Sequence, residues 1–288
     1  MVLPSLNRRD LGGFVEPRWI WIAVIGAAIL PGPCFGQEDR DSTAPPPLVT
    51  DRPDQTESAV VVPPGRVQVE VGWTRVADDP GAGDLVVSDG IGETLARIGV
   101  FRGVELRLGF AGFRLEETDA SGATSEDAYG GAALGAKFAL LQERGARPRL
   151  ALIAGTTIPS GARRFSTDSF DPFVRGTASH TLSDRLSLGY NLGAAWLTEE
   201  DDAGDDDTLS VLVATLTLGT AITERVGAFV ELFGESGLSD EGDFTAADAG
   251  FTWLVLDNLQ LDLSGGVGLS ENGPDWFGGV GVSFRLPS

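Results

Sequence analysis

Charged side chains at alternate positions of strand-like stretches are the residues of this chain whose types and spacing could do chemistry. The acids are Glu70, Glu105, Glu231, Asp248 and Asp262, and the bases are Arg97, Arg107, Lys137, Arg175 and Arg285. Unpaired charges are costly in an interior with little water, so these groups are expected to pair across the space they face. If these charges line the interior of a barrel, the balanced set predicts a narrow or partly blocked pore with a transverse electric field, not a wide anion-selective channel. The alternative is a network that only holds the wall together.

A second group of charges lies ahead of the first strand-like stretch, in the segment Thr50–Ser58. It holds Asp51, Arg52, Asp54 and Glu57, whereas a plain tether would need only Ser, Gly and Pro. We expect this segment to fold back into the pore mouth and narrow it through charge-assisted hydrogen bonds. The alternative is a disordered tether. The expected partners are Arg97, Arg107 and Lys137 for its acids, and Glu105 and Glu231 for Arg52.

Residues for catalysis are scarce. His180 is the one histidine, which excludes histidine-based metal centres and two-metal chemistry. The run around it lacks the His, Ser and Asn pattern of the outer-membrane phospholipases, which are also barrels of about this size. We therefore expect no enzyme activity, no catalytic residue, no metal centre and no cofactor.

Strict alternation of apolar and polar residues identifies the elements that must position these charges. It runs through 259–270, where leucines and valines alternate with Gln, Asp, Ser and Gly, and it returns in 275–286. A period of two places one set of side chains on each face of a strand. Strands of about ten residues with one small polar face and one apolar face are typical of an outer-membrane β-barrel.

The whole chain after residue 65 follows this pattern and predicts an all-β, closed antiparallel barrel of about twelve strands, with up-and-down topology. A soluble β-sandwich is the alternative, but it rarely keeps such regular alternation of short and long connections. The expected strands are 66–76, 92–101, 104–115, 127–141, 147–158, 170–182, 186–198, 208–222, 226–236, 245–255, 259–270 and 275–286.

The amino-terminal part of the chain predicts export. Arginines precede an apolar run over 19–30 that suits a signal peptide and is too short to span a bilayer stably. We expect 1–36 to be a signal peptide cleaved near Gly36, 37–64 an extended periplasmic segment, and 65–288 the barrel. Cleavage would remove Cys34, the one cysteine. The formal net charge of −21 excludes nucleic acid as a partner.

Short runs along the chain resemble a known family. They are "TDRPDQTES" at 50–58, "VPPG" at 62–65, "QVEVG" at 68–72, "ELRLG" at 105–109, "LGAKF" at 134–138 and "IPSG" at 158–161. Together they resemble the family named for a MetA pathway of phenol degradation, over essentially the whole mature chain. The resemblance implies an outer-membrane barrel that passes small solutes.

Acidic residues are concentrated in the connections expected to face outward. They are Asp78, Asp79, Asp84, Asp89, Glu116, Glu117, Asp119, Glu199, Glu200, Asp201, Asp202, Asp205, Asp206, Asp207, Asp240, Glu241 and Asp243. A solvated, repulsive surface is the plain interpretation. Weak capture of divalent cations, bridging outer-membrane lipid, is the other.

Two functions from different classes follow. The first is an outer-membrane channel or transporter for passive passage of small hydrophobic or aromatic solutes. The second is a structural or adhesive surface barrel whose acidic loops bind cations. Continuity of the lumen distinguishes them, since only the channel needs an open path.

Overall fold

The computed structural model describes residues 47–78, 85–119, 124–163, 165–200, 206–237 and 243–287. The expected signal peptide and its cleavage site lie outside these residues. The strands are β1 (Val67–Asp78), β2 (Leu85–Phe101), β3 (Val104–Phe110), β4 (Phe113–Asp119), β5 (Thr124–Tyr129), β6 (Ala132–Leu141), β7 (Arg149–Ile158), β8 (Pro172–Thr181), β9 (Leu186–Glu200), β10 (Asp206–Ala221), β11 (Val226–Gly237), β12 (Phe244–Leu256), β13 (Leu259–Gly268) and β14 (Trp276–Leu286).

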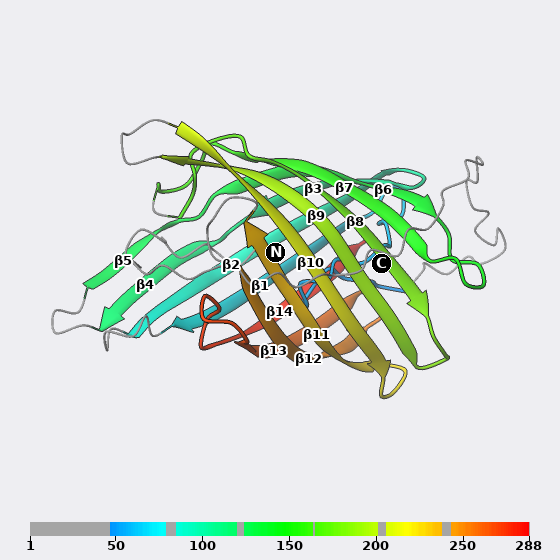
Figure 1. Cartoon of the computed structure of the whole chain (residues 1–288). Coiled ribbons are helices and arrows are strands. Elements are labelled where there is room, and N and C mark those ends of the chain that lie inside the picture. Colours follow the sequence, from blue (N-terminus) through cyan, green and yellow to red (C-terminus); the bar gives the residue numbers. More distant parts are fainter. Residues whose placement is uncertain are drawn as a thin grey trace.

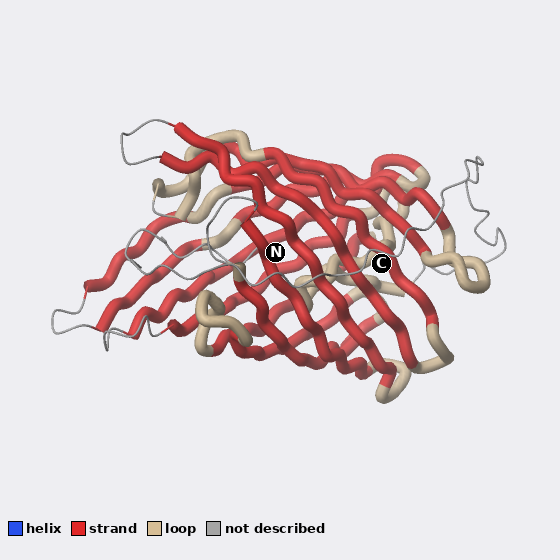
Figure 2. The backbone as a smooth tube through the Cα atoms, in the orientation of Figure 1, coloured by secondary structure: helices blue, strands red, loops and turns tan. Residues whose placement is uncertain are grey.

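These strands form one antiparallel sheet that closes on itself (Figures 1 and 2). Outside the region of β2 to β6, each strand pairs with its neighbours in the chain, and β1 closes the ring by pairing with both β14 and β2. Two of the wall strands are each broken in two, β3 with β4 and β5 with β6, so the barrel has twelve strands. The predicted fold class and strand number are confirmed.

None of the described residues belongs to a helix that is long and apolar enough to cross a membrane.

The two broken strands correct the predicted single strands 104–115 and 127–141. β3 and β4 are separated at Ala111–Gly112, and β5 and β6 at Gly130–Gly131. Gly112 has a left-handed φ of 79°, which favours glycine over residues with a Cβ. The two breaks lie opposite each other, since Ala111 and Gly130 donate to the carbonyl oxygens of Gly131 and Gly112, each at 2.8 Å.

Strand β2 is longer than the predicted 92–101. It begins at Leu85 and pairs with β1 on one side and with β4 on the other. Part of the expected outer connections 77–91 and 116–126 is therefore sheet, which Figure 1 shows as a long extension of β1, β2, β4 and β5. Asp89, expected in a loop, is buried and accepts hydrogen bonds from Trp73 and Arg75, each at 2.9 Å.

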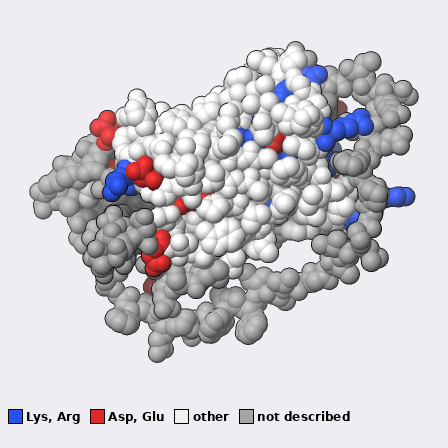
Figure 3. All heavy atoms as spheres, turned by 90° about the horizontal axis from the view of Figure 1, so that it is seen from above, with Lys and Arg blue, Asp and Glu red and all other residues white. Residues whose placement is uncertain are grey.

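The barrel is apolar outside and polar inside. Leu261, Leu263 and Val267 alternate along β13 as exposed residues, while Asp262 between them is buried. The most completely buried side chains include Arg97 and Lys137, the reverse of the core of a soluble sandwich. Over the middle of the face in Figure 3 few charged side chains are visible, and acids gather toward one end and bases toward the other.

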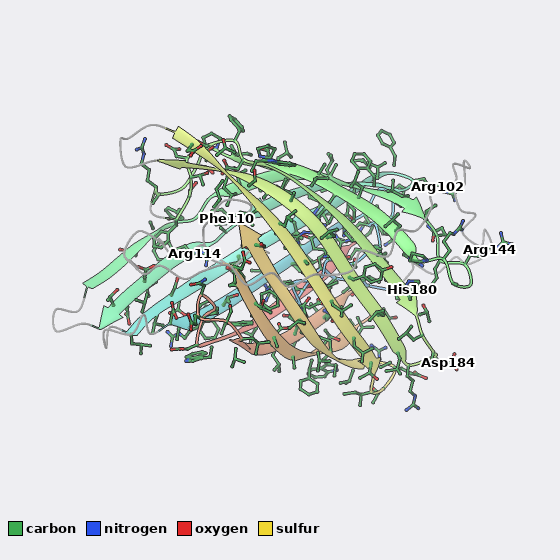
Figure 4. The ribbon with its side chains drawn as sticks, in the orientation of Figure 1. Arg102, Phe110, Arg114, Arg144, His180 and Asp184 are labelled. Atoms are coloured by element: carbon green, nitrogen blue, oxygen red, sulfur yellow. The ribbon has the colours of Figure 1, made fainter. Side chains whose placement is uncertain are left out.

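Short turns mark one end of the barrel. Arg102, Arg144 and Asp184 lie in three such turns, and Figure 4 places all three at the same end, with Arg114 in the other half. His180 lies near this end of β8, and its ring stacks on that of Tyr190 at a centroid distance of 6.0 Å. In bacterial barrels the short turns are periplasmic.

The assignment of β13 residues to an outer and an inner face predicts that arginine destabilises the barrel by different amounts at two adjacent positions. Leu263 is 52% exposed and belongs to the apolar outer face, and Ser264 belongs to the inner face. Arginine at Leu263, near the middle of the strand, should lower the free energy of unfolding by about 2–4 kcal/mol in a bilayer. Arginine at Ser264 should cost clearly less. Urea titration of both variants in lipid vesicles measures this, and equal losses would contradict the assignment.

Candidate functional site

Residues 47–66 precede β1 and lie inside the barrel, where side chains from several wall strands contact them (Figure 1). We call this stretch the inner segment. Its contacts include strands from opposite sides of the ring, β3 and β6 on one side and β11 and β13 on the other. The wall residues that contact it come mostly from the half of the barrel nearer the short turns.

Asp51 is the most heavily contacted acid of the inner segment. Its Oδ2 lies 2.6 Å from Arg107 Nη1, 2.8 Å from Lys137 Nζ and 3.3 Å from Arg97 Nη1. Its Oδ1 accepts hydrogen bonds from the backbone N–H and the hydroxyl of Ser58, at 2.9 and 2.7 Å. Burial alone would raise the pKa of Asp51, but the three facing cations outweigh burial and hold that pKa well below its ordinary value.

Arg97 connects the inner segment to the wall. Its guanidinium donates to Glu105 at 2.9 and 3.1 Å and to Glu70 at 3.1 Å, and all three side chains are inaccessible to solvent. It also donates to the carbonyl oxygens of Val49 and Val60, at 3.2 and 2.7 Å. The Arg97 guanidinium therefore donates hydrogen bonds both to two acids of the wall and to two carbonyl oxygens of the inner segment.

Glu57 is held a little further along the same side of the lumen. Its carboxylate lies 2.6 Å from Arg107 Nη2 and 3.3 Å from Arg175 Nη1. Burial would raise the pKa of Glu57, but these two guanidinium groups lower it to about 2. The amide of Asn191, turned so that its nitrogen faces the Glu57 carbonyl, donates to that oxygen at 3.1 Å and accepts from the Glu57 N–H at 2.7 Å.

The opposite side of the lumen is acidic, with Glu231 on β11, Asp248 on β12 and Asp262 on β13. Glu231 accepts from the Gln55 N–H at 2.7 Å and from the Thr56 hydroxyl, which also contacts Thr215 on β10. Asp248 faces Glu231 in the strand register and is buried beside it. The lumen thus has a basic side and an acidic side.

Arg52 contacts Asp262 rather than the predicted Glu105 and Glu231. Its Nη2 lies 3.4 Å from Asp262 Oδ1 and 3.3 Å from the Val280 carbonyl oxygen. Glu105 is already held by Arg97 and Arg107. Gly72 and Gly281 leave the space for the Arg52 guanidinium, because a Cβ at either position would overlap it.

Some residues that hold the inner segment were not singled out from the sequence. Gln68 donates to the Val49 carbonyl oxygen and Gln260 to the Thr50 hydroxyl, at 2.8 and 2.9 Å. Both residues lie at inward positions of β1 and β13. The alternation of apolar and polar residues therefore predicts that they face the lumen, but it does not predict which residue they contact. Arg285, which was singled out, donates to the Pro47 carbonyl oxygen at 3.1 Å.

The acidic outer connections lie partly outside the described residues, including Asp79, Asp84, Asp201 to Asp205, Asp240 and Glu241. Among the residues that the structure describes, no group of three or more His, Cys, Asp or Glu side chains is placed to hold a metal ion.

The pKa of Asp54 predicts that pH affects how firmly the inner segment is held inside the barrel. Burial, and then the charges of Glu231 and Asp248, raise the pKa of Asp54 well above its ordinary value. Asp54 therefore takes up a proton when the inner segment enters the barrel, and this proton uptake stabilises the inner position. The stabilisation is complete below the ordinary pKa of an aspartate and is lost as pH rises through the raised pKa of Asp54. Asp51 and Glu57 act oppositely, since their contribution is lost only as pH falls below their ordinary pKa values.

We therefore expect the inner segment to be held less firmly from mildly acidic toward neutral and alkaline pH; if it closes a pore, single-channel recording should show an open fraction that increases over this range. Uptake of one proton on closing changes the closed-to-open ratio by up to about tenfold for each pH unit. Asp54→Asn should flatten the dependence and favour the closed state, whereas Asp257→Asn, on an exposed turn, should change nothing. A wild-type curve that stays flat over this range would contradict the assignment.

A closed antiparallel barrel with an apolar outer face and a charged interior defines the class of this protein, which is an outer-membrane β-barrel. The particular family follows from the sequence match. The chain belongs to the family described as "Putative MetA-pathway of phenol degradation", whose model matches residues 50–286. The match begins at Thr50, so it includes the charged part of the inner segment as well as the wall.

Solved structures share the fold at low sequence identity. An outer membrane channel from Pseudomonas putida F1 has a TM-score of 0.59 and 14% identity, over 78% of this chain and 97% of that chain. The NanC porin has a TM-score of 0.50 and 12% identity, over 76% and 100% of the two chains. The translocator domain of the autotransporter NalP from Neisseria meningitidis has a TM-score of 0.50 and 12% identity, over 77% and 88%. No curated protein matches the chain.

Proposed function

We propose that this protein is a passive outer-membrane channel for small hydrophobic or aromatic solutes, and that the inner segment is its gate. The observation that carries the proposal is the inner segment itself, held across the lumen by buried ion pairs to both sides of the barrel. The family description supports an aromatic solute, and the channel from Pseudomonas putida F1 supports a channel. We also propose that residues 1–36 direct export and are removed, leaving 37–64 ahead of the barrel.

The contacts favour a gate over a permanent part of the wall. Backbone hydrogen bonds join neighbouring strands of the barrel throughout, whereas side chains make most of the contacts between the inner segment and the wall. Exposed or hydrated ion pairs contribute little, so partial entry of water would weaken these contacts far more than it weakens the barrel. The inner segment can therefore leave the lumen while the ring of strands stays intact.

A disulfide lock tests the proposal. The hydroxyl oxygens of Thr56 and Thr215 are 2.6 Å apart, so cysteines at both positions are close enough to be bridged. Solute uptake is measured in a strain without the chromosomal copy, carrying wild type, the Thr56→Cys/Thr215→Cys variant or Thr215→Cys alone. We expect the double variant to block uptake until reductant is added, and the single variant to behave as wild type.

The rival function gives a different result. A structural or adhesive barrel with cation-binding loops would show no uptake difference between wild type and the locked variant, before or after reduction. Uptake in all strains equal to that of the deletion strain would overturn the channel proposal.

A further inference from the structure

The basic side of the lumen is a built binding site for carboxylates. Arg97, Arg107 and Lys137 place three nitrogens within 3.3 Å of one oxygen of Asp51. Arg107 and Arg175 together hold the carboxylate of Glu57. The cations come from wall strands β2, β3, β6 and β8, and the inner segment supplies the two acids and the carbonyl oxygens of Val49, Ser58 and Val60. The site would therefore remain in the wall if the inner segment left.

The charges on this side balance only with the inner segment in place. Four wall cations, Arg97, Arg107, Lys137 and Arg175, face two wall acids, Glu70 and Glu105. Asp51 and Glu57 supply the two missing negative charges. An opened lumen would hold two uncompensated cations, which is costly unless an anion replaces the departed acids.

We propose that this cation cluster binds the carboxylate of small organic acids, aromatic acids included, and that the bound acid displaces Asp51 and opens the lumen. This inference rests on the proposed channel function and narrows its solutes. Guanidinium groups offer paired donors that match the two oxygens of a carboxylate, and the Lys137 ammonium adds a third donor. A neutral aromatic solute offers no charge to replace that of Asp51.

The opposite wall limits the choice further. Glu231, Asp248 and Asp262 face the lumen there, and all three are buried. A second carboxylate on the solute would meet these acids and be repelled. A hydroxyl group would instead donate to them. The site therefore favours monocarboxylates over dicarboxylates.

Single-channel recording of the full mature chain in planar bilayers tests the inference with benzoate, its neutral analogue benzamide, and the dicarboxylate phthalate. Benzoate should raise the open fraction at concentrations at least about tenfold lower than benzamide requires, because it replaces charge-assisted hydrogen bonds. Phthalate should be weaker than benzoate. Equal effects of benzoate and benzamide would overturn the proposal.

Chemical rescue provides a second measurement that does not depend on gating. Asp51→Ala removes the carboxylate from the centre of the cation cluster and keeps only the Cβ. In the full-length variant, acetate should raise the temperature of heat-dependent barrel unfolding, and acetamide at the same concentration should not. Arg107→Gln added to Asp51→Ala should weaken the acetate effect. No difference between acetate and acetamide would overturn the proposal.

The two proposals can fail separately. If a chain that starts at Val60 conducts but benzoate and benzamide act alike on the full chain, the gated channel stands and the carboxylate site is wrong. If that shortened chain does not conduct, the channel proposal is wrong and the carboxylate inference falls with it.

Discussion

A mature chain that starts at Val60 is expected to conduct through a pore that the full chain keeps mostly closed. The truncation removes Asp51, Arg52 and Glu57 together with their buried ion pairs. Hydrogen bonds to charged groups contribute roughly 1.5–3 kcal/mol each, so losing even one should raise the open fraction by at least about tenfold.

Single-channel conductance and open fraction in planar bilayers measure this effect. The matched control is a chain that starts at Pro47, which keeps the whole inner segment and should conduct like the full chain. A chain starting at Val60 that conducts no better than this control would show that the inner segment is not the gate.

Alternation was sufficient to predict the barrel but not its local breaks. The apolar positions change phase at Ala111–Gly112, from Leu106, Leu108 and Phe110 to Phe113 and Leu115, and the predicted strand 104–115 ran through this change. The breaks depend on contacts between strands: Gly112 and Gly130 face each other across the wall, and a Cβ at either would overlap neighbouring atoms. Such contacts join residues far apart in the sequence, and hydrophobic period does not encode them.

The same limit applies to the lumen. Inward positions of charge follow from the strand pattern, and Arg107 and Lys137 contact Asp51 as hypothesised. The predicted partners of Arg52 were wrong. Arg52 fits into the space beside Gly72 and Gly281, and Glu105 is already paired with Arg97. Asp89 was assigned to a loop because it lies between the predicted strands 66–76 and 92–101, yet it belongs to β2 and accepts hydrogen bonds from Trp73 and Arg75. The charge of a residue in the sequence indicates that it forms an ion pair, but the packing around it decides which residue it pairs with.

Replacement of Arg97 by glutamine is expected to cost far more stability than replacement of an exposed arginine. The Arg97 guanidinium is fully buried and lies within hydrogen-bond distance of Glu70 and Glu105, with Asp51 at 3.3 Å. Removing one partner of a buried ion pair leaves uncompensated charge and typically costs about 3–5 kcal/mol. Arg97→Gln should lower the free energy of unfolding by about that amount and should also loosen the inner segment, which loses the donors to Val49 and Val60.

Arg225→Gln is the matched control, since its salt bridge to Asp257 is also with a carboxylate, at 3.1 Å, but both side chains are largely exposed. An exposed pair contributes less than about 1 kcal/mol because water screens it. Urea unfolding of both variants in lipid vesicles, followed by tryptophan fluorescence, separates the two cases. Similar losses would mean that water reaches Arg97 and that the basic side of the lumen is open in the full chain. A large loss of stability for Arg97→Gln alone would show that Arg97 is shielded from water while it contacts both the inner segment and the wall acids. When the inner segment leaves, another anion must then replace the negative charge of Asp51.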